Sequence, residues 1–257
     1  MKRFTVVILA LFFVLINTFA CFAQNYTKKN LALTSSDGFN LRATLTYPKI
    51  KNKREYQTVV LLHSHGTDST WWGDLPNSLL ENGYAILTID LRGHGFSVYN
   101  SKLIKVSWKS LTNNAYKKYP DDVMSVINYI INEYPKMQFF DEWAIVGSDI
   151  GASAGIIAAD KLKITKPKTI VMLSPVVQTR GLYIPVSIAQ LSDVDFLSIS
   201  SSDDSTSLEA EKYLKKFAQN EFSIYTSPSK HSGMVILKND PEIIPFITEW
   251  IKEYLKP

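Results

Sequence analysis

Short apolar runs rich in β-branched residues alternate with longer segments whose apolar residues recur every three or four positions. The first pattern is typical of buried parallel strands and the second of amphipathic helices. We expect strands at residues 58–62, 84–89, 143–146, 169–173, 196–199 and 222–225. We expect helices at residues 75–81, 121–133, 150–162, 208–217 and 242–254. This alternation predicts an α/β fold with a mostly parallel sheet flanked by helices.

Two further apolar runs, residues 31–34 and 40–46, precede this series. They flank the sequence Ser35-Ser36-Asp37-Gly38, whose small and polar residues favour a turn. We therefore expect an antiparallel hairpin at one edge of the sheet, which brings the predicted number of strands to eight.

In open α/β sheets, ligands and catalytic groups gather in the loops at the carboxyl ends of the strands. The polar residues that follow the predicted strands are therefore the candidates for a functional site. They are His63, Ser64 and His65, then Asp90, Arg92 and His94, then Ser148 and Asp149, and finally Asp203, Asp204 and His231.

A nucleophile elbow is predicted at Asp149. Such an elbow is a sharp turn from a strand into a helix, and it needs small residues two positions either side of the nucleophile because the backbone there is strained and crowded. Gly147 and Gly151 meet this requirement. The apolar run 143–146 leads in, and a segment rich in Gly and Ala leads out.

A second match to the same pattern lies close by, because Gly151-Ala152-Ser153-Ala154-Gly155 has the form G-x-S-x-G. An elbow at Ser153 would require the strand to continue through Gly147, Ser148 and Gly151, which have poor strand propensity. We therefore expect Ser153 to lie one turn into the helix and not to act as the nucleophile.

An acid and a histidine follow the elbow in the order expected of this class of catalytic triad. His231 lies in a polar loop after the last predicted strand, and Asp204 follows a serine-rich strand end. Asp204 is preferred to Asp203 as the acid because it stands further beyond the strand. Either aspartate could instead cap the helix that follows.

The oxyanion donors are predicted to be the backbone amides of His65 and of Ile150, the residue after the nucleophile. The side chains of His63 and His65 are expected to be structural or to line the pocket, and His94 to be a turn residue. No Asp or Glu stands at metal-ligand spacing from a histidine, so we expect neither a metal nor a cofactor.

The first 23 residues have the three regions of a secretory signal peptide. Lys2 and Arg3 are followed by an apolar run and then by Ala20-Cys21-Phe22-Ala23. We expect cleavage before Gln24, an exported (periplasmic or secreted) protein, and one domain over residues 24–257. An alternative is that Cys21, the only cysteine, carries the lipid of a lipoprotein. If cleavage removes Cys21, cysteine chemistry is excluded.

The charge of the chain gives little indication of a macromolecular partner. Its formal net charge is +4, and loss of Lys2 and Arg3 removes two positive charges and leaves +2. The remaining basic residues are interspersed with acidic ones, so nucleic acid is not an expected partner. We expect a small-molecule substrate and no stable membrane span after cleavage.

The motifs together resemble the α/β-hydrolase superfamily over nearly all of residues 24–257. The most characteristic stretch runs from Leu61 to Ser97. The segment Val146–Ala152, followed by Leu173-Ser174-Pro175 and Arg180-Gly181-Leu182, is similar to small bacterial hydrolases of the dienelactone-hydrolase and esterase type. The resemblance implies an eight-stranded sheet with little or no cap, and it implies serine at the position of Asp149.

The aspartate matters because serine attacks an acyl carbon, whereas a carboxylate is better suited to displacement at an alkyl carbon. Haloalkane dehalogenases and epoxide hydrolases also carry aspartate at the elbow. The chain departs from the dehalogenase pattern, which usually has tryptophan where Ile150 stands, and residues 174–193 leave little room for the cap of an epoxide hydrolase.

Three functions are compatible with these residues. The first is a hydrolase that acts on a small ester-like, epoxide or alkyl halide substrate through Asp149, His231 and Asp204. The second is a degenerate relative that binds a ligand without turnover. The third is a partner-binding protein that exposes Trp71 and Trp72, although we expect both to be buried. The hydrolase is preferred because the acid and histidine positions are filled.

Overall fold

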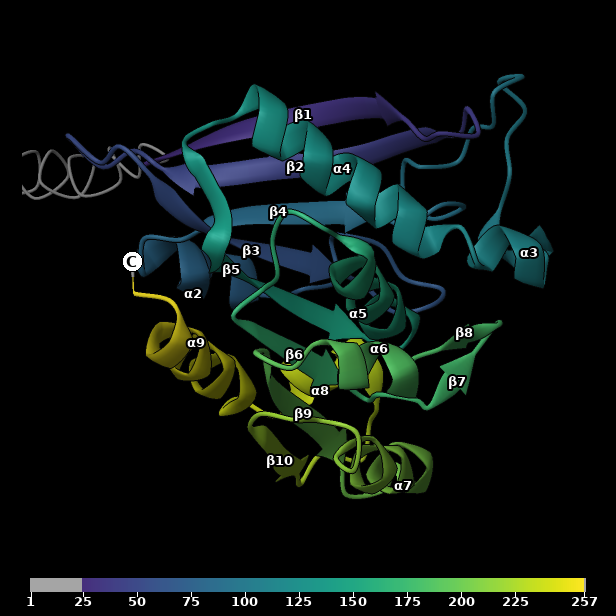
Figure 1. Cartoon of the computed structure of the whole chain (residues 1–257), viewed down its shortest axis with the longest axis vertical. Helices are drawn as coiled ribbons and strands as arrows, with labels where there is room; N and C mark the ends of the chain where they lie inside the picture. The colour runs from purple at the N-terminus through teal and green to yellow at the C-terminus, as the bar shows by residue number, and fades with distance from the viewer. Residues whose placement is uncertain (1–24, 257) are drawn as a thin grey trace, which may run out of the picture.

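The structure is a computed structural model that describes residues 25–256. Its centre is an eight-stranded sheet with the strand order β1-β2-β4-β3-β5-β6-β9-β10 (Figure 1). The predicted α/β class and the mostly parallel eight-stranded sheet are confirmed. The strands are β1 (Tyr26–Thr34), β2 (Asn40–Pro48), β3 (Tyr56–Leu62), β4 (Ala85–Asp90), β5 (Met137–Ser148), β6 (Thr169–Leu173), β9 (Asp195–Ser201) and β10 (Phe222–Ser227).

The amino-terminal hairpin lies at one edge of the sheet, as predicted. β1 pairs antiparallel with β2, and β2 pairs antiparallel with β4, whereas the remaining neighbours are parallel. Along β2, Leu41, Ala43 and Leu45 are buried, while Arg42 and Thr44 alternate with them and face the other side. This period of two makes the hairpin apolar on one face and polar on the other.

Helices cover both faces of the sheet. The core on one face is shared with α4, α5, α6 and α7, and the core on the other face with α2, α8 and α9 (Figure 1). These helices are α2 (Leu75–Glu81), α4 (Tyr119–Glu133), α5 (Ile150–Lys161), α6 (Pro185–Gln190), α7 (Ser205–Leu214), α8 (Ile236–Asn239) and α9 (Ile243–Tyr254). None of the helices within residues 25–256 has the length and apolar character to span a membrane.

Two segments have local structure that the hydrophobic pattern did not predict. Between β4 and α4 the chain forms a short 3-10 helix, Trp108–Ser110, and the one-turn helix α3 (Asn113–Tyr116). Between β6 and β9 it forms α6 and a small hairpin of β7 (Gln178–Thr179) and β8 (Leu182–Tyr183). These elements are too short to show a periodicity in the sequence.

The two adjacent tryptophans behave differently. Trp72 is 1% exposed and packs in the core beneath α2 and α9, as predicted, but Trp71 is 52% exposed. The prediction that both are buried is therefore wrong for Trp71.

The predicted signal peptide, its cleavage before Gln24 and the alternative role of Cys21 lie outside the described residues.

The register of the central strands places the predicted site residues at one edge. Leu62, at the end of β3, is level with Gly147 of β5, and Ser148 is level with Leu173 at the end of β6. The loops that follow these three strands therefore begin side by side. This arrangement brings His65 next to Asp149.

Candidate active site

Asp149 lies at the turn between β5 and α5, where the sequence predicts the elbow. Its φ of 51° and ψ of −117° are far from the values of strand or helix, and its amide donates to the carbonyl of Leu173 at 3.0 Å. A non-glycine residue in such a conformation costs about 1–3 kcal/mol and persists only where the surroundings impose it.

The glycines around the turn are required by packing. A methyl group at Gly147 would lie 2.5 Å from Cα of Ala152, and one at Gly151 would overlap the carbonyl oxygens of Leu62 and His63. The start of α5 is thus pressed against the end of β3. This contact fixes the position of Asp149 relative to the loop that carries His65.

Ser153 is a residue of α5, as predicted, and it is buried. Its hydroxyl donates to the carbonyl of Asp149 at 3.4 Å, four residues earlier in the chain. A helical serine commonly makes this local bond, and the bond leaves the hydroxyl directed along the helix.

The carboxylate of Asp149 faces the two backbone amides that were predicted to be oxyanion donors. The amide of His65 donates to Oδ2 at 3.3 Å, and within residues 25–256 no hydrogen bond is made to Oδ1. Burial raises the pKa of Asp149 above its ordinary value, against the opposing effect of hydrogen bonds from the His65 and Ile150 amides and of the positive charge of Arg180. Oδ2 is therefore bound by an amide that was predicted to be an oxyanion donor.

The imidazole of His65 is held beside this carboxylate by Tyr116. The Tyr116 hydroxyl donates to the carbonyl of Trp108 at 2.8 Å and lies 2.9 Å from Nε2 of His65. Because the hydroxyl proton is committed to Trp108, Nε2 of His65 is the donor in the second bond. Burial is the main cause that lowers the pKa of His65, so the ring is favoured in its neutral form.

His63 and His94 are structural, as expected. The amide of Leu91 donates to Nε2 of His63 and the amide of Gly66 to Nε2 of His94, each at 3.0 Å. A nitrogen that accepts from an amide carries no proton, so both rings are neutral and fix the loops around the site. The pKa of His94 is lowered to about 3, and burial of the ring is the largest cause.

The predicted acid and histidine are not joined by a hydrogen bond. The two oxygens of Asp204 accept from the amide and the hydroxyl of Ser207, at 3.1 and 2.8 Å, so Asp204 caps α7. Asp203 and His231 are exposed. In the described part of the chain no hydrogen bond links the His231 ring to Asp149, Asp203 or Asp204.

The loop that carries His231 is nevertheless anchored at the site. The hydroxyl of Ser229 accepts from the amide of His231, and the amide of Ser229 donates to the hydroxyl of Ser227, each at 3.1 Å. Ser227 in turn donates to the buried carboxylate of Asp240 at 2.6 Å. This relay determines the backbone position of His231 at the carboxyl edge of the sheet.

Further along the same loop, the amide of Gly233 donates to the hydroxyl of Ser174 at 2.6 Å. Ser174 follows β6, so this bond ties the histidine loop to a loop that directly flanks the elbow. The loop is thereby held against the site at both ends.

A cavity of about 340 Å³ opens over the elbow. Its lining includes His65, Asp149, Ser174, Asp204 and Ser232, but not His231. The structure therefore brings together around one space the five loops that follow β3, β5, β6, β9 and β10, and the His231 ring lies outside that space. Within residues 25–256 no group of three or more His, Cys, Asp or Glu side chains is arranged to hold a metal ion.

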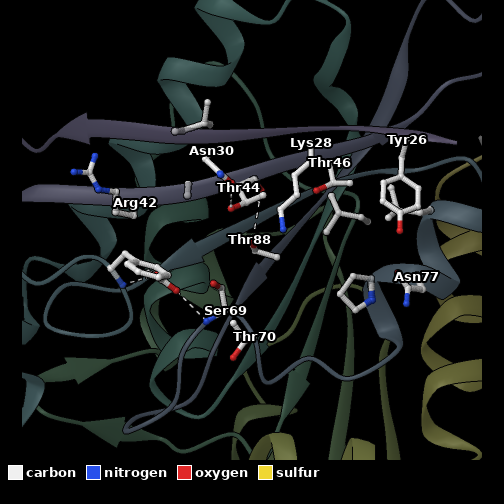
Figure 2. Close-up of a pocket in the computed structure, with 17 residues that line it drawn as sticks. Tyr26, Lys28, Asn30, Arg42, Thr44, Thr46, Ser69, Thr70, Asn77 and Thr88 are labelled. Carbon is white, nitrogen blue, oxygen red and sulfur yellow. Dashed lines mark hydrogen bonds between the residues drawn. The ribbon is translucent and has the colours of Figure 1, made fainter. Parts of the chain in front are cut away.

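A larger cavity, of about 640 Å³, lies over the polar face of the hairpin (Figure 2). Of the candidates that follow the predicted strands, only Asp90 lines it, and neither the predicted triad nor the predicted oxyanion donors do. Thr44, Thr46, Thr88 and Lys28 project into it from β1, β2 and β4. This cavity lies on the solvent-facing side of the hairpin, where the polar residues of β2 alternate with buried apolar ones. Most of its lining residues belong to the strands and not to the loops that follow them. We therefore place the candidate site at the elbow and not here.

Tyr116 contacts the His65 ring and Arg180 lies over Tyr116, and neither residue was predicted to lie near the elbow. Tyr116 lies in α3, and the guanidinium Cζ of Arg180 lies 5.3 Å from the centre of the Tyr116 ring. Arg180 occupies the turn between β7 and β8. Both residues belong to the two short segments that show no hydrophobic periodicity. The sequence pattern therefore did not indicate that they lie near Asp149.

Comparisons with known proteins agree with the fold. A family model described as serine aminopeptidase, S33, matches residues 53–221, which is more than half of the chain. An esterase from Pyrococcus furiosus aligns with a TM-score of 0.66 at 16% identity, covering 89% of this chain and 93% of that one. A search of curated sequences finds no protein that matches.

Two further solved structures are similar at the same level. An acetyl xylan esterase from Paenibacillus sp. R4 aligns with a TM-score of 0.68 at 11% identity, covering 92% of this chain and 86% of that one. A cold-adapted esterase from an Arctic intertidal metagenomic library gives 0.64 at 14% identity, covering 88% of this chain and 94% of that one. At such identities the likeness shows the fold alone.

Proposed function

Because the chain belongs to the serine aminopeptidase S33 family, we propose that it is a hydrolase in which the carboxylate of Asp149 replaces the usual serine and attacks an alkyl carbon. The observation that supports this most directly is the position of the carboxylate. The amide of His65 donates to Oδ2, and Oδ1 makes no hydrogen bond within residues 25–256. One oxygen is thus fixed and the other is available to react.

In the first step, a lone pair of Oδ1 forms a bond to the alkyl carbon of a halide or epoxide. The bond from that carbon to the halogen or epoxide oxygen breaks, and the leaving group takes the electron pair. The product of this step is an alkyl ester of Asp149. A carboxylate is a suitable nucleophile for such a displacement, whereas its attack on an acyl carbon gives a reactive anhydride.

In the second step, water attacks the carboxyl carbon of that ester while His231 takes its proton. Negative charge develops on Oδ2, where the amide of His65 stabilises it, and the amide of Ile150 is the second proposed donor. The bond from the carboxyl carbon to the alkyl oxygen then breaks, His231 returns the proton to the departing alcohol, and Asp149 is regenerated. Asp204 would orient the His231 ring.

Intact-protein mass tests this proposal. The protein and its His231→Ala variant are incubated with a panel of small haloalkanes, epoxides and esters. We expect an alkyl adduct to accumulate in His231→Ala and to map to Asp149, because removal of the base blocks the second step. Asp149→Asn is the control and should remain unmodified. An adduct on another residue, or none with any compound, would contradict the proposal.

The second candidate function is ligand binding without turnover. It is favoured by one observation: Asp204 is occupied by Ser207, and the His231 ring is exposed and unconnected to either aspartate within the described residues. A ligand that binds the wild type, that is recovered chemically unchanged after long incubation and that leaves no adduct in His231→Ala would support this function.

We also propose that the protein acts outside the cytoplasm, since residues 1–23 have the pattern of a signal peptide. Amino-terminal sequencing of protein recovered from the periplasm or medium should give Gln24. Retention of Met1, or a lipid on Cys21, would contradict the proposed cleavage.

A further inference from the structure

The turn between β7 and β8 holds an arginine in an unfavourable backbone conformation. Arg180 and Gly181 are the two residues of this turn, and their φ values are 50° and 85°. Positive φ at both positions is the signature of a type I′ turn, in which Asn-Gly is the preferred pair. A residue with a long side chain, such as arginine, is strained at positive φ at the first position, and the turn could form without this strain if asparagine stood there.

The turn is held against the site by packing. A methyl group at Gly181 would lie 2.6 Å from Cε of Lys117, so the Lys117 chain covers the turn. The Arg180 guanidinium stacks over Tyr116, which contacts the His65 ring, and the amide of His65 contacts Asp149. Arg180 is thus three contacts from the reacting carboxylate.

The guanidinium is not neutralised by a partner. Arg180 is exposed, and across residues 25–256 no carboxylate lies within ion-pair distance of it. Its charge nevertheless acts at the site, because it lowers the pKa of both Asp149 and His65. The arginine therefore presents unused donors three contacts from Asp149, outside the set of residues that line the cavity over the elbow.

We propose that Arg180 is a specificity-determining residue that binds a carboxylate of the substrate, so that the substrate class is a small carboxylic acid with an electrophilic carbon further along its chain. An arginine fork matches a carboxylate with two parallel hydrogen bonds. It also offsets the repulsion that Asp149 would exert on an anionic substrate. This inference rests on the proposed function and extends it to a substrate class.

The test compares acids with their neutral amides. Bromo-substituted carboxylic acids of two to five carbons, with bromine on the terminal carbon, and the corresponding primary amides are incubated with the His231→Ala variant. The rate of alkylation of Asp149 is followed by intact mass. We expect the acid of suitable length to react at least about tenfold faster than its amide, since a hydrogen bond to a charged group is a strong one.

Arg180→Asn, combined with His231→Ala, is the informative variant, because asparagine suits the turn and the variant should fold. It should bring the acid-to-amide ratio close to one, and Arg180→Lys should retain part of the preference. Arg54→Asn is the matched control. Arg54 is exposed and precedes β3, at the amino-terminal ends of the parallel strands, whereas the site lies at their carboxyl ends, so the ratio should not change.

An electrostatic role for Arg180 without substrate recognition gives a different result. It would slow the acid and the amide equally in Arg180→Asn, and that outcome would overturn the inference. An acid-to-amide ratio that does not change in Arg180→Asn would overturn it as well.

Binding of unreactive ligands separates this inference from the proposed function. Affinities of propanoate, butanoate and pentanoate, and of their amides, are measured by NMR titration of the wild type and of Arg180→Asn. If no compound alkylates Asp149 but the carboxylates bind more tightly and Arg180→Asn removes that preference, the carboxylate site is supported and the displacement chemistry is wrong. No carboxylate preference in either experiment overturns the inference.

Discussion

Oδ2 of Asp149 lies 3.3 Å from the backbone nitrogen of His65, so an amide of the loop after β3 binds the carboxylate at the elbow. The predicted nucleophile is thus in direct contact with the His65 amide, one of the two predicted oxyanion donors. An aspartate in this position is both held and partly charge-stabilised by the loop after β3.

Asp149→Ser is expected to convert the site to ordinary esterase chemistry. The shorter side chain frees the amides of His65 and Ile150 to receive an oxyanion and supplies a hydroxyl. A single oxyanion donor can contribute about two to three orders of magnitude in rate, so hydrolysis of short p-nitrophenyl esters should become measurable. The gain should disappear when His231→Ala is added, because an unassisted hydroxyl is a weak nucleophile.

If Asp149→Ser folds normally and hydrolyses these esters no faster than the double variant, His231 does not act on residue 149. The ligand-binding function would then be preferred.

Asp149→Asn is expected to raise the stability of the protein at neutral pH. Burial raises the pKa of Asp149, so the ionised form is disfavoured in the folded state relative to the unfolded state. The free-energy penalty for burying the ionised carboxylate is absent at pH values below the ordinary aspartate pKa. It reaches its full size at pH values above the raised pKa of the folded state. The gain in Tm of Asn over wild type should therefore be largest near pH 7 and should shrink as the pH falls through the raised pKa.

Asparagine also tolerates positive φ and keeps an oxygen for the His65 amide, so the variant changes charge and little else. A Tm difference that does not depend on pH would contradict this explanation.

Ser153→Ala is expected to leave reactivity unchanged. The Ser153 hydroxyl is buried within α5 and bonds only the carbonyl of Asp149, so neither protein should react with a fluorophosphonate probe at this position. Stability should change by no more than about 0.5 kcal/mol, the difference in helix propensity between the two residues. Labelling of the wild type that is lost in Ser153→Ala would show that the elbow lies at Ser153.

Gly151→Ala is expected to destabilise the protein strongly. The added methyl would overlap the carbonyl oxygens of Leu62 and His63, and backbone atoms cannot rotate away as a side chain can. Overpacking typically costs about 1–3 kcal/mol, and this site should reach the upper end or exceed it. Denaturant unfolding measures the effect. Gly73→Ala is the comparison: nothing lies within 4 Å of a methyl at Gly73, so its cost is only that of alanine at a φ of 56°, about 1 kcal/mol.

Arg92→Ala should cost about 3–5 kcal/mol of unfolding free energy, because it leaves a buried carboxylate without its partner. Arg92 binds Asp122 of α4 through two hydrogen bonds, at 2.7 and 2.8 Å, and Asp37 of the β1–β2 turn at 2.7 Å. Lys252→Ala is the control, since its pair with Glu249 is exposed and should contribute less than about 1 kcal/mol. Equal losses in the two variants would contradict the assigned role of Arg92.

The sequence by itself determined the sheet, five of the covering helices (α2, α4, α5, α7 and α9) and the position of the elbow. Burial of parallel strands on both faces produces continuous apolar runs such as 58–62 and 169–173, and both were located correctly because that pattern is local. The glycines two positions either side of Asp149 were equally informative, because steric exclusion by Ala152 and by the end of β3 permits nothing larger.

Tertiary structure alone decided how the side chains around the elbow are used. Whether Asp204 meets His231 or Ser207, and whether Trp71 is covered, depends on which distant segments pack nearby, and strand order and register govern that packing. The same holds for Tyr116 and Arg180, which reach His65 from two short segments without periodicity. Hydrophobic periodicity reports the face that an element buries, but it carries no information on which polar groups meet across loops.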